Sequence, residues 1–374
     1  MSNKQQWTLE AYKNASDVMI RASSAEELIE GVCDGITNEA PFVLAWVALK
    51  QNDADKSVKV AGVAGPVSKY VKNIQVSWDE SKPEGLGPTG RCIRSNASVC
   101  ILDTEADPTF LPWRQIAIEH SIKSLIAVPV HVGNEVIGVL LVYANIKATF
   151  DKEVVTLFEN LANQIGFSLK SLENDNLLEF SLEMTITALS TAMESRDPYT
   201  VGHSKRVASI SVEIAKRLGW DGQELKCLKK AALAHDIGKI GVPIELLTKP
   251  SPLCEIERNM INLHAIKGYE ILKDIPFPQP VAEMVRQHHE RLDGSGYPFG
   301  LKGDEILLGA KIIGVADTIE AMSTNRPYRF AKGLDAAISF ISKESGRLFD
   351  SDVVEVCKQL NDEGVLRAIV DDSR

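Results

Sequence analysis

Two kinds of hydrophobic periodicity divide the first 150 residues. Residues 5 to 40 carry apolar side chains at helical spacing, such as Leu28, Ile29, Val32 and Ile36, and predict an amphipathic helix. A glycine-led turn at 133–135 predicts a hairpin. Short apolar or alternating runs, separated by glycine, proline and asparagine, predict strands at 41–50, 58–65, 98–103, 124–132 and 135–144. An antiparallel sheet with helices, of the α+β class, is therefore expected here.

A long helix is predicted next, because no proline occurs from residue 151 to about residue 196 and apolar residues such as Leu161 and Ile165 recur at helical spacing. At about 1.5 Å per residue it would extend on the order of 70 Å, which is more than one domain covers. Its apolar stripe is therefore expected to pair with a second copy of the chain. A core helix broken near residues 173–176 is the alternative. Beyond this helix the pattern is almost entirely helical.

The length of 374 residues suits two domains of about 150 to 200 residues each. We expect a first domain over 1–150, a helical linker over 151–195 and a second domain over 196–374. The formal charge of −10 argues against nonspecific binding to nucleic acid. No secretory signal pattern is present, and the most apolar run, 136–144, is too short to cross a bilayer. A cytoplasmic protein without membrane insertion is expected.

Histidines and acids interrupt the apolar helices of the second half. His235 and Asp236 lie inside the otherwise apolar stretch AALAHDIGKIG, and Asp317 ends another apolar run. A carboxylate buried on such a face needs a partner, for which a metal ion is one candidate. A lone case is more often a hydrogen-bonded core group. Several cases on separate segments favour a metal site, and five of the seven histidines lie in this half.

The motifs of this half resemble a known family. The His235-Asp236 pair, HHERLDGSGYP at 288–298 and DTIEAMSTNRPYR at 317–329 resemble, in this order, the HD-GYP subgroup of the HD metal-dependent phosphohydrolases. The resemblance implies an all-α domain that hydrolyses cyclic di-GMP to linear pGpG, with further cleavage to GMP left open. Over about residues 1 to 170 the chain resembles a GAF domain, a small-molecule sensor. The expected fold is thus an α+β GAF domain joined by a long helix to an all-α HD-GYP domain.

The resemblance also implies roles for single residues. Two divalent metal ions are expected, and mixed imidazole and carboxylate ligation favours iron or manganese. A pair of ions activates water and offsets phosphate charge. The implied metal ligands are His203, His235 and Asp317 for one ion, His264, His288 and His289 for the other, and Asp236 as a catalytic bridge. The implied substrate-binding residues are Lys239, Gly296, Tyr297, Pro298, Arg326 and Arg329, with Gly294 shaping the loop.

Lys239 has a second implied role, in catalysis. Four residues after His235, it would face the same side of a helix and reach a phosphate or the attacking water. Two positions depart from the family pattern. Glu320 stands where aspartate is frequent, and Tyr199 stands where some members carry a glutamate that binds a third metal, so two ions are expected.

The expected partners are cyclic di-GMP, an unknown small-molecule or protein signal at the GAF domain, a second copy in a homodimer, and a protein with a diguanylate cyclase domain. Two alternatives remain open. One is a catalytically weak or silent receptor for the dinucleotide, against which the intact ligand spacing argues. The other is hydrolysis of cyclic GMP-AMP, because the recognisable pocket residues contact phosphate and do not select the base.

Overall fold

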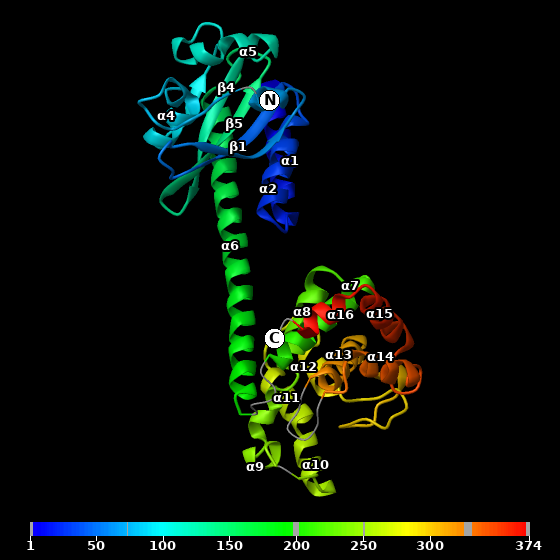
Figure 1. Cartoon of the computed structure of the whole chain (residues 1–374). Helices are drawn as coiled ribbons and strands as arrows, with labels where there is room; N and C mark the ends of the chain where they lie inside the picture. The colour runs from blue at the N-terminus through cyan, green and yellow to red at the C-terminus, as the bar shows by residue number, and fades with distance from the viewer. Residues whose placement is uncertain (1–2, 73, 197–201, 250, 325–330, 372–374) are drawn as a thin grey trace. The chain divides into compact units, whose positions relative to one another are not determined.

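The computed structural model describes the chain except residues 1–2, 73, 197–201, 250, 325–330 and 372–374 (Figure 1). The described residues form two compact units, Met1–Leu178 and Glu179–Arg374. The predicted fold class is confirmed, since the first unit contains an antiparallel sheet with helices and the second is helical. No described helix is both long enough and apolar enough to cross a membrane.

The sheet of the first unit has the strand order β2-β1-β5-β4-β3, and every neighbouring pair is antiparallel. All five predicted strands are present, and the predicted hairpin joins β4 to β5 through Gly133, whose φ of 61° suits glycine. The strands are β1 (Phe42–Lys50), β2 (Val58–Ala64), β3 (Val99–Ile101), β4 (Ser124–Val132) and β5 (Glu135–Ala144).

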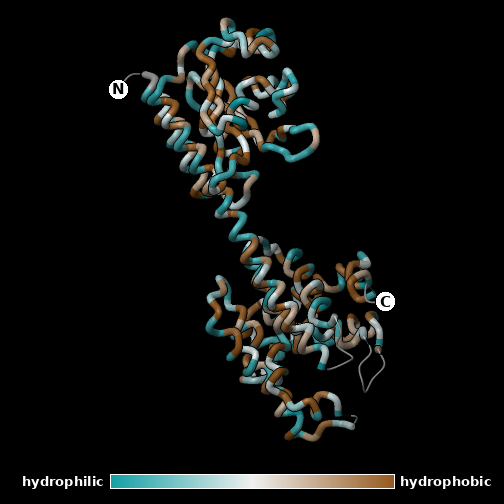
Figure 2. Tube along the Cα trace, turned by 90° about the vertical axis from the view of Figure 1, so that its left-hand side faces the viewer, coloured by the Kyte–Doolittle hydropathy of each residue, from teal (hydrophilic) through white to brown (hydrophobic). Residues whose placement is uncertain are grey.

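Both faces of this sheet are covered, and the side chains of β1 alternate between two cores. Ala45 and Val47 pack with α1, α2 and the start of α6, whereas Leu44 and Trp46 face α3, α4, α5 and η2. Figure 2 colours the Cα trace by hydropathy and shows hydrophobic positions recurring within the first unit. The covering elements are α1 (Asn3–Arg21), α2 (Ala25–Thr37), α3 (Lys69–Lys72), η1 (Pro83–Gly85), α4 (Pro88–Ser95), η2 (Pro108–Trp113) and α5 (Arg114–Glu119).

The single helix expected over residues 5 to 40 is wrong, because two helices occupy this stretch. α1 ends at Arg21 and α2 begins at Ala25. The Ser24 side chain accepts a hydrogen bond from the Glu27 amide at 3.1 Å, and the Glu27 carboxylate accepts one from the Ser23 amide at 2.9 Å. This exchange satisfies amides that the first turn of α2 leaves without helical partners.

The long helix is confirmed as α6 (Lys152–Glu194), and it has no break at residues 173–176. The first turns of α6 contribute to the core of the first unit, whereas Ile186, nearer the end of the helix, belongs to the core of the second unit. Leu161 and Ile165 are fully buried in the first unit's core, so their assignment to a contact between two copies is wrong. The exposed apolar residues of α6 are instead Phe167, Leu177, Leu178, Phe180, Met184 and Leu189.

The second unit packs helices around one hydrophobic core, and its described residues form no strand beyond isolated bridges. Its core contains residues from α6 through α16, from Ile186 near the end of α6 to Leu366 in the last helix. The elements are α7 (His203–Arg217), α8 (Gly222–Ala234), η3 (Ile237–Gly241), α9 (Ile244–Leu247), α10 (Glu255–Asn262), α11 (His264–Leu272), α12 (Val281–Gln287), η4 (Gly303–Glu305), α13 (Leu308–Ser323), α14 (Leu334–Lys343), α15 (Ser351–Asp362) and α16 (Val365–Asp371).

Candidate metal centre

Five segments of the second unit bring the seven predicted ligand residues to one place. Each of the seven lies at an end of a helix, just beyond one, or inside α13. Three groups of them have candidate ligand atoms within 4.8 Å of one another: His203 with His235 and Asp317, His264 with His288 and His289, and His235 with Asp236 and His288. The first two groups contain the same residues as the two ligand sets that the sequence resemblance implied.

Asp236 lies between these groups. Its Oδ2 is 3.5 Å from His235 Nε2 and 3.7 Å from His203 Nε2, while its Oδ1 is 3.5 Å from His264 Nε2. The two oxygens of one carboxylate therefore face histidines of different groups. This geometry suits a carboxylate that contacts two cations at once.

Three of the histidines have the same local hydrogen bond. The Nδ1 atoms of His235, His264 and His288 lie 2.6 to 2.8 Å from the backbone carbonyl oxygens three residues earlier. A carbonyl only accepts, so each Nδ1 must carry the proton, and a neutral ring then has a bare lone pair at Nε2. This arrangement fixes the tautomer of a metal-binding imidazole.

For His264 and His288, the two unprotonated Nε2 atoms consequently face each other, and the Nε2 atoms of His203 and His235 lie similarly close. His264 Nε2 lies 3.4 Å from His288 Nε2, and His203 Nε2 lies 3.2 Å from His235 Nε2. Two neutral acceptors in such contact repel each other unless a cation or a proton lies between them. The donor set thus fits divalent metal ions, for which neutral imidazole and carboxylate are common ligands.

The electrostatics favour the protonation states that metal ligands need. Burial lowers the pKa of His264, and it lowers the pKa values of His288 and His289 well below the usual value. These three rings are therefore neutral. Burial alone would raise the pKa of Asp236, but Lys239 and the surrounding histidines outweigh it and hold the pKa well below the usual range. Asp236 is therefore ionised at neutral pH.

His203 is held by an acidic residue whose role the sequence analysis missed. Its Nδ1 donates to Glu320 Oε2 at 2.5 Å, and Glu320 also accepts from Arg206 at 2.6 Å. Burial would lower the pKa of His203, but Glu320, Asp317 and Asp236 together raise it. Burial would raise the pKa of Glu320, but His203 and Arg206 lower it to about 2. A carboxylate behind a histidine in this way orients the ring and increases its basicity.

We expect Glu320→Gln to weaken metal binding by about 10- to 100-fold, because the ring of His203 loses the charge that orients it and makes it basic. Metal retained after dialysis against graded chelator measures this. Glu213→Gln, at a partly exposed carboxylate on the same helix as His203, is the matched control. Equal metal retention in the two variants would contradict this role for Glu320.

Two close contacts hold the ligand-bearing segments together. Glu194, near the end of α6, accepts hydrogen bonds from the amides of Gly202 and Ser204 at 2.7 Å each, which fixes the start of α7 beside His203. At Gly238, a Cβ atom would lie 1.9 Å from the His264 carbonyl oxygen. Only glycine therefore lets η3 approach α11 closely enough for Asp236 to reach His264.

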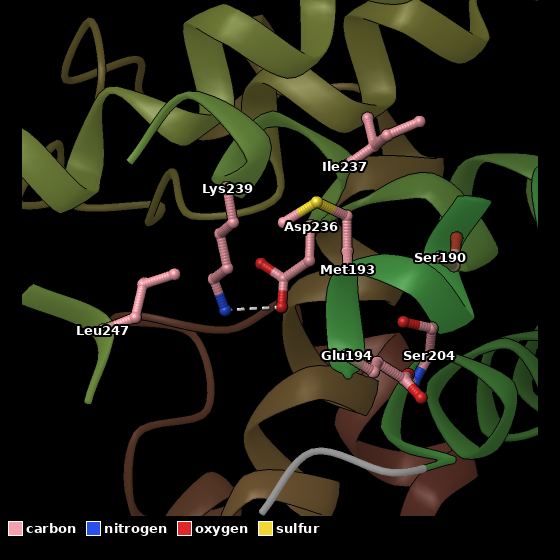
Figure 3. Close-up of a pocket in the computed structure, with 8 residues that line it drawn as sticks. All are labelled: Ser190, Met193, Glu194, Ser204, Asp236, Ile237, Lys239 and Leu247. Carbon is pink, nitrogen blue, oxygen red and sulfur yellow. Dashed lines mark hydrogen bonds and ion pairs between the residues drawn. The ribbon is translucent and has the colours of Figure 1, made fainter. Parts of the chain in front are cut away.

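Lys239 lies at this centre, but not for the reason that its spacing suggested. α8 ends at Ala234 and a 3₁₀ helix, η3, begins at Ile237, so no single α-helix carries both His235 and Lys239. The Lys239 ammonium instead donates to Asp236 Oδ2 at 2.6 Å (Figure 3). The two residues line a small, partly open hollow together with Met193, Glu194 and Leu247. Lys239 is therefore next to the metal centre and beside open space.

The predicted glycine-rich loop follows His289, and a buried acid holds it. Glu290, which is 4% exposed, accepts hydrogen bonds from the amides of Phe299 and Leu301 at 2.7 and 3.0 Å. The ring of Tyr297 lies 4.7 Å from that of His289, and Pro298 follows it through a cis peptide bond.

The two glycines of this loop are also constrained. Gly294 has a φ of 80°, and a Cβ at Gly296 would lie 2.5 Å from the His289 carbonyl oxygen. The loop is thus packed against the histidine pair. The predicted phosphate-binding residues Arg326 and Arg329, and also Tyr199, lie outside the described residues.

Comparisons with known proteins agree with this division into two units. Residues 187–353 match the family profile of the HD domain, and residues 22–170 match that of the GAF domain. The chain is 39% identical over 193 residues to the cyclic di-GMP phosphodiesterase response regulator RpfG of Xanthomonas campestris pv. campestris, a match that covers 51% of each protein.

Two further relatives match a similar share of the chain. The 3'3'-cGAMP-specific phosphodiesterase 3 of Vibrio cholerae is 39% identical over 178 residues, covering 48% of this chain and 39% of that protein. A cyclic di-GMP phosphodiesterase of Thermotoga maritima is 40% identical over 177 residues, covering 47% of this chain and 48% of that protein. The chain thus spans about half the length of these relatives or less. Its second unit belongs to the HD domain family, and its first unit is an N-terminal GAF domain.

Proposed function

We propose that this chain is a metal-dependent phosphodiesterase that hydrolyses cyclic di-GMP to linear pGpG. The observation that carries the proposal is the cluster of imidazole and carboxylate ligand atoms around Asp236, in which the unprotonated Nε2 atoms of His264 and His288 face each other at 3.4 Å. HD domains depend on metal ions. The names of the relatives supply the substrate class, cyclic dinucleotides.

Two divalent ions, iron or manganese, are the proposed cofactors. His203, His235 and Asp317 would hold one, His264, His288 and His289 the other, and Asp236 both. When bound, such ions lower the pKa of water toward about 7 and offset the charge of a phosphodiester. The protein contributes neutral imidazoles, an ionised Asp236 and the Glu320 carboxylate behind His203. The carboxylates around His203 raise its pKa without a cation, so a proton competes with a metal ion for this ring.

Lys239 is the proposed contact for the substrate phosphate or the attacking water. We expect Lys239→Ala to keep its metal but to slow hydrolysis by about 10²-fold, because it removes a charge that acts on the reacting groups. Metal content and initial rates measure the two effects, with the exposed Lys273→Ala as control. Loss of metal in Lys239→Ala would assign this lysine to the metal centre instead.

The rest of the substrate site is proposed from the sequence resemblance. Gly296, Tyr297 and Pro298 would border the bound dinucleotide, while Arg326 and Arg329 would bind its phosphates through their guanidinium groups. The packing of Tyr297 against His289 supports this proposal, since it places the loop beside the centre.

Cyclic GMP-AMP is the second candidate substrate, because relatives named as 3'3'-cGAMP-specific phosphodiesterases match this chain about as well as those named for cyclic di-GMP. Incubation of the metal-loaded chain with an equal mixture of the two dinucleotides distinguishes them by product analysis. We expect pGpG to appear first. Faster loss of cyclic GMP-AMP would reverse the assignment.

A dimer formed through α6 remains a proposal, with the exposed apolar residues of this helix as the contact in place of Leu161 and Ile165. Leu177, Leu178 and Phe180 are each more than 60% exposed on this helix, whereas Leu161 and Ile165 are buried. We expect Leu178→Glu to shift the full chain from dimer to monomer in light scattering at micromolar concentration, since a charge opposes burial of the stripe. Lys170→Glu on the same helix is the control. A wild-type chain that is monomeric throughout would refute the proposal.

The cellular setting is proposed on the same basis. The GAF domain would receive a small-molecule or protein signal that regulates hydrolysis in the cytoplasm, and a protein with a diguanylate cyclase domain is a candidate partner.

A further inference from the structure

The end of η3, the segment that carries Lys239, is exposed although it borders the metal centre. Ile237 and Gly238 are buried, and so is Val242, but residues 239–241 between them are partly or largely exposed. The carbonyl groups at the end of a short 3₁₀ helix have no partners within the helix. Core packing therefore does not fix this piece of backbone, and hydrogen bonds from elsewhere in the fold are needed.

Arg196, two residues after the end of α6, supplies most of these bonds. Its guanidinium donates to three carbonyl oxygens: from Nη1 to Lys239 at 3.3 Å and to Ile240 at 3.0 Å, and from Nη2 to Val242 at 3.1 Å. Lys267 of α11 donates to the carbonyl of Gly241 at 2.5 Å. Every carbonyl from residue 239 to residue 242 thus accepts a hydrogen bond from a cationic side chain.

We propose that Arg196 is a positioning residue for Lys239. A guanidinium can bond several oxygens at once, because its donors are fixed in one plane. Its bonds hold the backbone from which the Lys239 ammonium reaches Asp236 Oδ2 at 2.6 Å (Figure 3). None of these three bonds involves a metal ligand, so Arg196 acts on the centre through Lys239. The inference rests on the proposed function, in which this ammonium contacts the substrate phosphate or the attacking water.

A double-mutant cycle tests this role. Arg196→Ala should keep its metal and slow cyclic di-GMP hydrolysis by roughly tenfold, because a small displacement of a reacting group lowers the rate. In a Lys239→Ala background the same change should cost less than about twofold, since the group that Arg196 positions is already gone. A tenfold loss in both backgrounds would show a structural role that does not act through Lys239, and would overturn the proposal.

Two single variants make the cycle specific. Arg196→Lys keeps the charge but loses the planar fork of donors, so it should recover part of the rate that Arg196→Ala loses. Arg217→Ala removes an arginine that pairs with Glu363 on the surface of the same unit, and it should hydrolyse at the wild-type rate. An equal loss in Arg217→Ala and Arg196→Ala would contradict a specific role for Arg196.

Amide hydrogen exchange provides a readout that does not depend on hydrolysis. The amides of Lys239 and Val242 donate within this segment, to the carbonyls of Asp236 and Lys239. Their exchange should be roughly tenfold faster in Arg196→Ala and unchanged in Arg217→Ala, because the Arg196 bonds oppose local opening. Unchanged exchange in Arg196→Ala would overturn the proposal. Faster exchange in a chain that hydrolyses no cyclic dinucleotide would support the hold on η3 and refute only the proposed function.

Discussion

Replacement of Asp236 by alanine is expected to reduce cyclic di-GMP hydrolysis by more than the roughly 10²- to 10³-fold that loss of a single transition-state donor costs. The carboxylate faces His203, His235 and His264 at 3.5 to 3.7 Å, so no neighbour can replace it between the two ligand groups. Metal content should fall with activity. Product analysis by chromatography and elemental analysis of the same sample measure both.

Two further variants make this test specific. Asp236→Asn keeps the size of the side chain and should lose activity as well, because the amide lacks the charge that draws a cation. Asp304→Ala, at a fully exposed carboxylate, should behave as wild type. Hydrolysis by Asp236→Ala at the wild-type rate would remove this residue from the centre.

Gly238→Ala is expected to have the second largest effect. The added Cβ would lie 1.9 Å from the His264 carbonyl oxygen and 2.5 Å from the Gly268 amide nitrogen, so η3 and α11 must separate. A displacement of about 1 Å can cost roughly 10²-fold in rate, and overpacking typically costs about 1 to 3 kcal/mol in the free energy of unfolding. Hydrolysis rates and denaturant unfolding measure the two losses.

Gly364→Ala provides the control for stability alone. This glycine has a φ of 79° and no atom within 4 Å of the added Cβ, so alanine strains the backbone without crowding the centre. The control should lose stability, by about 1 to 2 kcal/mol, and keep its rate. If Gly238→Ala keeps its rate as well, the close approach of η3 to α11 is not needed for the site.

The secondary structure of the first unit could largely be predicted from the sequence. Alternating and apolar runs located all five strands, because period-2 patterning reflects burial in a sheet directly. The break between α1 and α2 was missed although its signal was present. Ser24 followed three residues later by Glu27 is a capping pattern that marks the start of a helix. It was overlooked because the apolar residues after it keep the helical spacing.

The length of α6 was predictable from the sequence, but the surroundings of its apolar residues were not. Its length followed from the absence of proline and the regular apolar spacing. The spacing could not show what covers each apolar residue, since Leu161 buried in a domain core and Leu178 exposed on the surface repeat with the same period. Tertiary packing decides this difference, and a single sequence does not contain it.

At the candidate site, residue types were predictable and their supporting partners were not. Glu320 and Glu290 are acids in buried positions, which already signals a bound partner. Glu320 meets His203, 117 residues away, and no spacing rule links such positions. The pairing of Lys239 with Asp236 was missed for a local reason, since residues 237–241 form a 3₁₀ helix where an α-helix was assumed.

Removal and return of the metal test the central proposal most directly. Anaerobically purified full chain is stripped with chelator, supplied again with Mn²⁺ or Fe²⁺, and assayed for conversion of cyclic di-GMP to pGpG alongside metal content. We predict no product from the stripped chain and recovery of hydrolysis as two ions per chain are bound. Equal hydrolysis by the stripped and the reloaded chain, or a fully loaded chain that releases no pGpG, would contradict the account.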